Sequence, residues 1–192
     1  MNEVKNILLV GVGGQGTILA SEILTRGLLS YGYDVKMSEI HGMSQRGGSV
    51  STQVRYGDKV NSPTIGKGNA DILVSFEEME AYRWLPYVKK SGVVVLNDYK
   101  IESSPMLIGK ASYPKGLKEE IKSKVKTELI EAAKIANELG NSKTMNVVLL
   151  GALIKEMGLE DIDWEKIIAE TVKAKFIDIN KEAFKRGLNY KK

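Results

Sequence analysis

The sequence predicts an α/β protein, and three observations lead to this fold class. Short apolar segments typical of buried strands alternate with longer segments of helical periodicity. The first apolar segment runs directly into a glycine-rich turn at 11–16, which a helix is expected to follow. The 192 residues show no internal repeat and no break in composition. We therefore expect a single domain over 1–192, with one open, mostly parallel, Rossmann-like sheet and helices on both of its faces.

Each element in the first part of the chain has a local signal. The apolar run after Lys5 predicts a buried strand. Apolar residues at helical spacing from Ile18 to Leu28 predict a helix, which Gly32 ends. Alternation of apolar and polar residues up to Tyr56 predicts a strand with two different faces. In order, the expected elements are a strand at 5–10, a helix at 15–31, and strands at 34–39 and 49–56.

The second part of the chain continues the alternation and closes with helices. Two fully apolar runs predict strands that are buried on both faces of a parallel sheet. The apolar helix that contains Gly151 is expected to pack closely on the sheet. In this part we expect strands at 70–76 and 93–96, a loop or weak strand at 101–114, and helices at 77–88, 117–139, 145–157, 164–175 and 179–187.

Composition restricts the classes of function. Hydrophobic residues make up 43% of the chain and charged residues 27%, as in soluble globular proteins. The absence of cysteine excludes disulfides, a thiol nucleophile and a thiolate-bound iron–sulfur cluster in this chain. A strand begins near residue 5 and no apolar run reaches the roughly 20 residues of a membrane helix, so we expect a cytoplasmic protein without a signal peptide. The net charge of +4 comes from mixed charges, so no nucleic-acid surface is expected.

The glycine-rich turn predicts a phosphate site. In such a turn Gly11 permits the tight corner after the strand, Gly13 lets a phosphate approach the backbone, and Gly16 lets the helix pack closely. Exposed N–H groups at the start of the helix, together with the helix dipole, favour an anion. The residues expected to bind the phosphates are Gly11, Gly13, Gly14, Gln15, Gly16 and Thr17. The alternative is a turn that only tightens a strand–helix corner and binds nothing.

Two side chains bear on the identity of the nucleotide. Glu39 follows Gly16 by 23 residues, near the position where NAD sites carry an acidic residue for the ribose hydroxyls. Gln15 is expected to place its side-chain amide beside the phosphates. A stand-alone NAD-binding module, such as a sensor or a small dehydrogenase, is therefore one candidate function.

A second glycine-rich loop follows the second strand. His41 is the only histidine, so it builds no metal site unaided, and it is either an acid–base group or a loop residue that binds backbone carbonyls. Arg46 lies between glycines and is suited to a phosphate, a carboxylate or an ion pair at a subunit surface. No residue is assigned a catalytic role. The candidate contacts to substrate, coenzyme A or a partner chain are His41, Ser44, Gln45, Arg46, Gly47 and Gly48.

Together the two motifs resemble the gamma-type subunit of 2-oxoacid:ferredoxin oxidoreductases. The turn at 11–16 and the loop at 38–49 carry the resemblance, and the loop is the more specific of the two. Further similar segments are 77–86, 97–98, 146–153, 175–180, 183–184 and Gly187. Within the family, the chain is most similar to the small (beta) subunit of the type that acts on indolepyruvate. Gamma subunits of the pyruvate and branched-chain 2-oxoacid types are the alternatives.

The resemblance implies a share in one reaction, the oxidative decarboxylation of a 2-oxoacid with coenzyme A to acyl-CoA, CO₂ and reduced ferredoxin. It also implies thiamine diphosphate, magnesium and iron–sulfur clusters. We expect these cofactors on a larger alpha subunit, since this chain has neither cysteine nor a Gly-Asp-Gly…Asn segment. The chain is then inactive alone, contributes coenzyme A or substrate binding and assembly, and serves a complex whose electron acceptor is ferredoxin. A purely structural subunit with an empty glycine turn is the remaining alternative.

Overall fold

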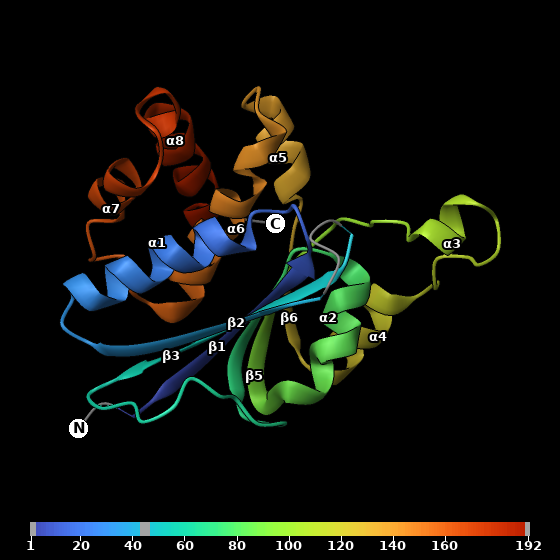
Figure 1. Cartoon of the computed structure of the whole chain (residues 1–192), viewed down its shortest axis with the longest axis horizontal. Coiled ribbons are helices and arrows are strands. Elements are labelled where there is room, and N and C mark those ends of the chain that lie inside the picture. Colours follow the sequence, from blue (N-terminus) through green and yellow to red (C-terminus); the bar gives the residue numbers. More distant parts are fainter. Residues whose placement is uncertain (1–2, 43–46, 191–192) are drawn as a thin grey trace.

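One six-stranded sheet organises the computed structural model, which describes residues 3–42 and 47–190 (Figure 1). Its strands follow the spatial order β2-β3-β1-β4-β5-β6. The strands are β1 (Lys5–Val12), β2 (Asp34–His41), β3 (Ser49–Gly57), β4 (Ala70–Ser75), β5 (Val88–Asn97) and β6 (Lys126–Ile130). Pairing is parallel from β1 through β4 and β5 to β6, whereas β3 runs antiparallel to both of its neighbours, β1 and β2. The predicted open, mostly parallel sheet is confirmed, with β3 as the reversed strand.

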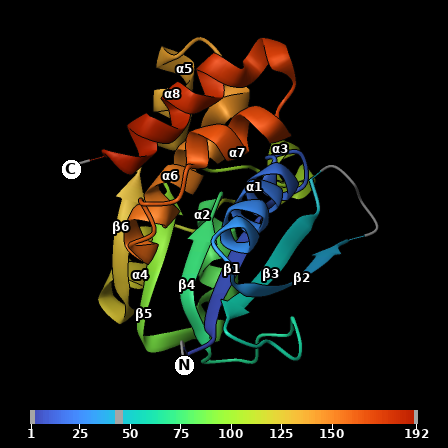
Figure 2. The same ribbon diagram turned by 90° about the vertical axis from the view of Figure 1, so that its left-hand side faces the viewer.

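Helices cover both faces of the sheet, as predicted (Figures 1 and 2). One face carries α1, α5, α6, α7 and α8, and the other carries α2 and α4. The helices are α1 (Thr17–Ser30), α2 (Glu78–Trp84), α3 (Ser104–Leu107), α4 (Leu117–Lys124), α5 (Ala132–Glu138), α6 (Met145–Met157), α7 (Trp164–Thr171) and α8 (Ile177–Leu188). Short 3₁₀ segments are η1 (Leu85–Tyr87), η2 (Ser142–Thr144) and η3 (Ala174–Phe176). Within the described ranges, no helix combines the length and the apolar character that crossing a bilayer requires.

Two hydrophobic cores form because the central strands are apolar on both sides. In β1, Ile7 and Leu9 belong to the core under α1 and α6, while Leu8 and Val10 belong to the core under α2 and α4. All four side chains are at most 1% exposed. This alternation follows from the two-residue period of a strand, and it explains why the strand is apolar at successive positions.

The prediction of a single helix at 117–139 is wrong, because this range contains two helices with a strand between them. Helix α4 ends at Lys124, Val125 adopts an extended backbone, and β6 then pairs in parallel with β5 before α5 begins. Lys126 and Glu128 have side chains that suit a helix equally well, so local propensity did not reveal the strand. Pairing with an exposed edge of β5 decides the conformation here, because β preference depends strongly on the neighbouring strand.

Three smaller differences concern the ends of elements. The helix expected at 77–88 ends at Trp84, because Pro86 lies in a 3₁₀ turn that begins at Leu85, and β5 then begins at Val88. The expected loop at 101–114 contains the short helix α3. The helix expected to reach residue 175 ends at Thr171.

Helix α6 packs on the sheet, as predicted, and its Gly151 lies against a second helix, α8. A Cβ built on Gly151 would lie 2.2 Å from the carbonyl oxygen of Phe184 in α8. A Cβ built on Gly187 would lie 1.9 Å from the carbonyl oxygen of Val148 in α6. The backbones of α6 and α8 therefore touch, and only residues without a Cβ permit this approach.

Replacing Gly187 with alanine should destabilise the chain by about 2 kcal/mol or more, because the new methyl group overlaps the α6 backbone. Urea unfolding followed by circular dichroism measures the change in the free energy of unfolding. Gly42→Ala is the control, since its nearest neighbouring atom, the Ser49 carbonyl oxygen, is 3.9 Å from the new Cβ. Equal stability of the two variants would contradict the close helix contact.

Candidate functional site at the glycine turn

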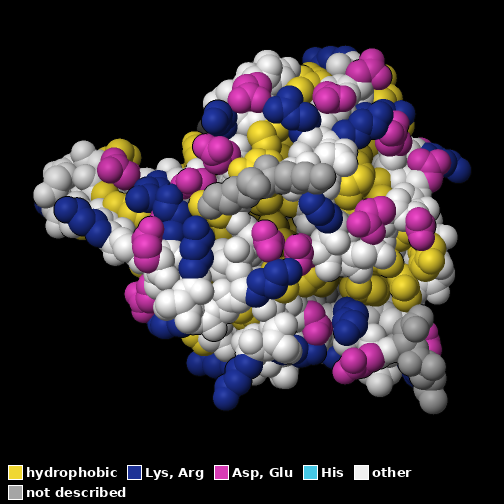
Figure 3. Space-filling model, turned by 180° about the vertical axis from the view of Figure 1, so that it is seen from behind, with side chains coloured by type: hydrophobic (Ala, Val, Ile, Leu, Met, Phe, Trp, Pro, Cys, Tyr) yellow, Lys and Arg dark blue, Asp and Glu magenta, His cyan; other side chains and the backbone are white. Residues whose placement is uncertain are grey.

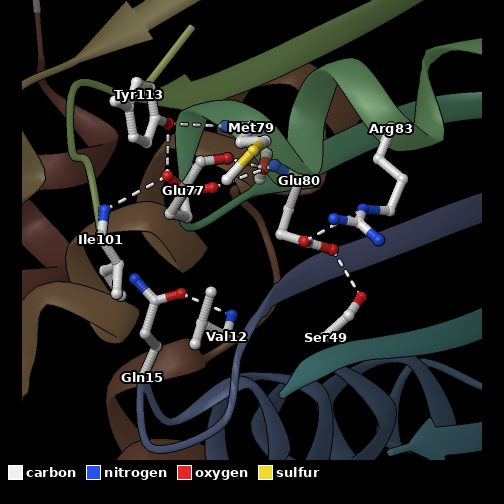
Figure 4. A network of polar contacts seen from close by, with 10 residues as sticks. Val12, Gln15, Ser49, Glu77, Met79, Glu80, Arg83, Ile101 and Tyr113 are labelled. Atoms are coloured by element: carbon white, nitrogen blue, oxygen red, sulfur yellow. Dashed lines mark hydrogen bonds and ion pairs between the residues drawn. The ribbon is translucent and has the colours of Figure 1, made fainter. Parts of the chain in front are cut away.

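The side-chain amide of Gln15 hydrogen-bonds to the backbone on both sides of the glycine turn (Figure 4). Its Oε1 accepts a hydrogen bond of 2.7 Å from the Val12 N–H. Its Nε2 donates one of 2.8 Å to the carbonyl oxygen of Phe76, the residue that follows β4. Both ends of the amide are therefore engaged within the protein. The sequence predicted this amide beside phosphates and did not reveal its contact with Phe76.

Two glycines of the turn are required by close packing. A Cβ on Gly11 would lie 2.8 Å from Gln15 Oε1 and 2.9 Å from the Cβ of Phe76. A Cβ on Gly16 would lie 2.5 Å from Nδ2 of Asn146, which donates a hydrogen bond of 3.0 Å to the Gly16 carbonyl oxygen. The start of α1 is thereby fixed to the start of α6. Close packing at Gly16 was expected, but its partner is Asn146 and not the strand.

The second glycine-rich loop reaches the first one. The Gly13 N–H donates to the Gly48 carbonyl oxygen at 2.8 Å, and the Gly47 N–H donates to the Gly13 carbonyl oxygen at 3.4 Å. His41 is the last residue of β2, is exposed, and pairs with Val50 of β3. The structure thus brings Gly13, Gly47 and Gly48 together, with His41 on the adjoining strand end.

Three of the predicted loop residues, Ser44, Gln45 and Arg46, lie outside the described residues. Their proposed contacts to substrate, coenzyme A or a partner chain stay predictions. Thr17, the last residue of the predicted phosphate site, is the first residue of α1 and is 4% exposed. The Thr17 side chain therefore packs inside the molecule, so Thr17 would bind an anion through its backbone N–H.

An open groove of about 740 Å³ lies beside the turn. Its wall includes Gly14, Gly16, Leu19, Tyr99, Lys143 and Asn146. The first N–H groups of a helix have no partner inside the helix, and Gly16 at the N-cap of α1 supplies no side-chain cap. The first turn of α1 also has no acidic residue. These N–H groups, the helix dipole and Lys143 give the groove the character of an anion site.

The topology argues against the NAD alternative. In a dinucleotide fold the strand that carries the ribose-binding acid lies directly beside the first strand. Here β3 lies between β1 and β2, and Glu39 of β2 pairs with Thr52 of β3. Glu39 is therefore one strand further from the glycine turn than a ribose-binding acid should be.

A buried carboxylate lies next to the turn and was missed by the sequence analysis (Figure 4). Glu77, which is 1% exposed, follows Phe76 and caps α2 by accepting a hydrogen bond of 2.9 Å from the Glu80 N–H. It also accepts from the Ile101 N–H at 3.2 Å and from the Tyr113 hydroxyl. The Tyr113 oxygen in turn accepts from the Met79 N–H at 2.9 Å. Consecutive glutamates at the end of an apolar strand were the available signal.

A second glutamate connects this network to the second loop. Glu80, which is 4% exposed, accepts a hydrogen bond from the Ser49 hydroxyl and pairs with Arg83 at 3.2 Å. This hydrogen bond ties the first residue of β3 to α2. Among the described residues, no group of three or more His, Asp or Glu side chains is arranged to hold a metal ion.

Replacing Gln15 with alanine should destabilise the chain by about 1–3 kcal/mol, because it leaves the Val12 N–H and the Phe76 carbonyl oxygen without their partner. Thermal and urea unfolding measure this loss. Gln15→Glu is the informative comparison, since it keeps the acceptor for Val12 but places an oxygen against the Phe76 carbonyl. Wild-type stability in both variants would contradict the bridging role of Gln15.

Tyr113 should make the free energy of unfolding fall as the pH rises into the alkaline range. Burial, and then the hydrogen bond to Glu77, raise the pKa of Tyr113 far above its usual value. The unfolded chain releases this proton near pH ~10, whereas the folded chain keeps it, so the free energy of unfolding falls as the pH rises above about 10. Urea unfolding between pH 8 and pH 11 should show a shallower fall for Tyr113→Phe than for the wild type. Identical slopes would contradict a Tyr113 phenol that stays protonated in the folded chain.

Comparison with known protein families agrees with the fold and the motifs. The family model described as pyruvate ferredoxin/flavodoxin oxidoreductase matches residues 6–190. The indolepyruvate oxidoreductase subunit IorB of Pyrococcus horikoshii is 41% identical over 191 residues, which cover 95% of this chain and 94% of that protein. The pyruvate synthase subunit PorC of Methanothermobacter marburgensis is 30% identical over 176 residues, which cover 90% of this chain and 89% of that protein.

A solved structure has the same fold. The gamma subunit of a keto/oxoacid ferredoxin oxidoreductase from Geobacter sulfurreducens aligns with a TM-score of 0.70 at 23% identity. The alignment covers 95% of both chains. The described sheet and its covering helices are thus those of a gamma-subunit structure.

Proposed function

The chain belongs to the pyruvate ferredoxin/flavodoxin oxidoreductase family and is a small subunit of a 2-oxoacid:ferredoxin oxidoreductase, and from this premise we propose that its groove binds coenzyme A. The observation that carries the proposal is the groove beside the first turn of α1, with Lys143 among its lining residues. Coenzyme A carries a diphosphate and a further phosphate, which backbone N–H groups, a helix dipole and an ammonium group bind well. The open groove leaves room for the rest of the molecule.

The thiamine diphosphate and the iron–sulfur clusters of such a complex do not fit this chain. It has no cysteine, and its described residues contain no group arranged to hold a metal ion. We therefore assign the decarboxylation chemistry, with its magnesium and its clusters, to a larger subunit. When bound there, thiamine diphosphate supplies the stabilisation of the carbanion that decarboxylation leaves. This chain would hold the acyl acceptor and orient its thiol toward that subunit.

We propose an aryl 2-oxoacid of the indolepyruvate kind as the substrate of the complex. The support is the 41% identity with a subunit named for indolepyruvate, against 30% with a subunit named for pyruvate. The complex reconstituted with its larger subunit should have a higher kcat/KM for indolepyruvate than for pyruvate or a branched-chain 2-oxoacid. A preference for pyruvate would overturn this substrate assignment but would leave the proposal that the groove binds coenzyme A unaffected. The ferredoxin partner, the cytoplasmic location and the single domain over 1–192 stay predictions from the sequence.

Lys143→Glu should raise the KM of the complex for coenzyme A roughly tenfold, because it places a negative charge against the phosphates. The kcat at saturating coenzyme A should change little, since Lys143 lies in the binding groove and has no part in the chemical step. Initial rates of acceptor reduction at varied coenzyme A concentration provide the measurement.

Lys166→Glu on α7 is the matched control, since this lysine is exposed and lines a different surface, away from the glycine turn. The same charge reversal there should leave the KM for coenzyme A unchanged. Equal KM values for wild type, Lys143→Glu and Lys166→Glu would favour the structural subunit with an empty turn.

A further inference from the structure

Residues 99–116, here called the arm, project from the body of the molecule between β5 and α4 (Figures 1 and 3). The arm carries the short helix α3 at its far end, well away from the sheet (Figure 1). Most of its residues are exposed. A segment of this length that projects into solvent needs an explanation, since surface loops ordinarily pack on the elements they connect.

Buried polar contacts hold the base of the arm in place. Glu77 accepts hydrogen bonds from the Ile101 N–H on the outgoing segment of the arm and from the Tyr113 hydroxyl on the returning segment. Just outside the arm, Asp98 and Lys118 form an ion pair of 2.8 Å. Burying the Glu77 carboxylate is costly, and its donors offset that cost only while both sides of the arm stay in position. The arm is thus built to project in one direction.

The tip of the arm exposes two adjacent aliphatic side chains. Leu107 is 69% exposed and Ile108 is 66% exposed, the two highest values among the large hydrophobic residues of the described ranges. The backbone at the tip is ordered by its own hydrogen bonds, from the N–H of Leu107 to Ser103 and from the N–H of Ile108 to Ser104. Single exposed hydrophobic residues are common, but a preformed pair at the end of a fixed projection is typical of an interaction site.

The charges along the arm indicate the chemistry of the partner. The arm contains the lysines Lys100, Lys110 and Lys115 and one acidic residue, Glu102. Lys100 is paired with Glu78 at 3.5 Å, whereas Lys110 and Lys115 have no ion pair within residues 3–42 and 47–190. A partner surface that covers the tip should therefore combine an apolar socket with carboxylates at its rim.

The position of the arm selects the larger subunit as that partner. Tyr99 and Ile101 at the base of the arm line the same groove as the glycine turn. If coenzyme A occupies this groove and the thiamine chemistry takes place on the larger subunit, that subunit must lie against the mouth of the groove. The arm projects beside this mouth, so a subunit seated there can enclose the tip.

We propose that the arm is the docking element for the larger subunit, with Leu107 and Ile108 inserted in an apolar socket and Lys110 facing acidic residues around it. This inference rests on the proposed function. The fixed base lowers the conformational entropy that binding must overcome, because the tip is ordered before the subunits meet.

The test compares two pairs of substitutions in the chain, each assembled with its larger subunit. Leu107→Ser with Ile108→Ser removes the apolar tip. Leu29→Ser with Met37→Ser is the matched control, since these side chains of α1 and β2 are 52% and 43% exposed and lie outside the arm. Biolayer interferometry measures the affinity, and circular dichroism establishes that both variants are folded. We expect the arm variant to bind at least about thirtyfold more weakly and the control to bind like the wild type.

Hydrogen–deuterium exchange gives a second readout that needs no substitution. Amides of the arm tip, residues 102–112, should become protected when the larger subunit binds the wild-type chain. Unchanged affinity of the arm variant, an equal loss in the control, or unprotected tip amides would each overturn the docking role. Self-association of the chain that the tip substitutions abolish, with subunit affinity retained, would assign the arm to a second copy instead. A wild-type chain that binds no larger subunit would contradict the proposed function itself.

Discussion

The side-chain amide of Gln15 is the contact on which the geometry of the glycine turn depends. It joins the Val12 N–H at the end of β1 to the carbonyl oxygen of Phe76, directly after β4, two positions far apart in the chain. Because Gly11 has no side chain, the amide fits against the backbone there. The carboxyl ends of the two central strands and the start of α1 are thereby held as one unit, and this unit forms a wall of the groove.

The same region connects binding to assembly. Phe76, which accepts from Gln15, is followed directly by Glu77, which holds both sides of the arm. Asn146 fixes the opposite wall of the groove to Gly16. The proposed coenzyme A groove and the proposed docking arm are consequently anchored to neighbouring residues at the carboxyl ends of the central strands β1 and β4. If the acyl group is made on the larger subunit, as proposed, this arrangement would determine how the acyl acceptor is presented to that subunit.

The parts of the fold that depend on local signals could be predicted from the sequence. The apolar runs of β1 and β4, the helical spacing of α1 and the glycine turn are properties of short segments. What could not be predicted depends on pairing between distant segments. Residues 126–130 become a strand only because β5 offers an edge, and β3 separates β2 from β1 through a hairpin that residue types do not specify. The buried role of Glu77 was equally hidden, because its donors Ile101 and Tyr113 lie 24 and 36 positions away.

The most direct test of the central claim is to locate coenzyme A in the assembled complex. A photoreactive coenzyme A analogue, bound to the complex and illuminated, labels the peptides that surround it, and mass spectrometry then identifies them. We expect labelled peptides from the turn at 13–19 or from the opposite wall at 133–146, with labelling suppressed by unmodified coenzyme A. Labelling confined to the larger subunit would show that coenzyme A does not bind in this groove, and the chain would then serve assembly alone.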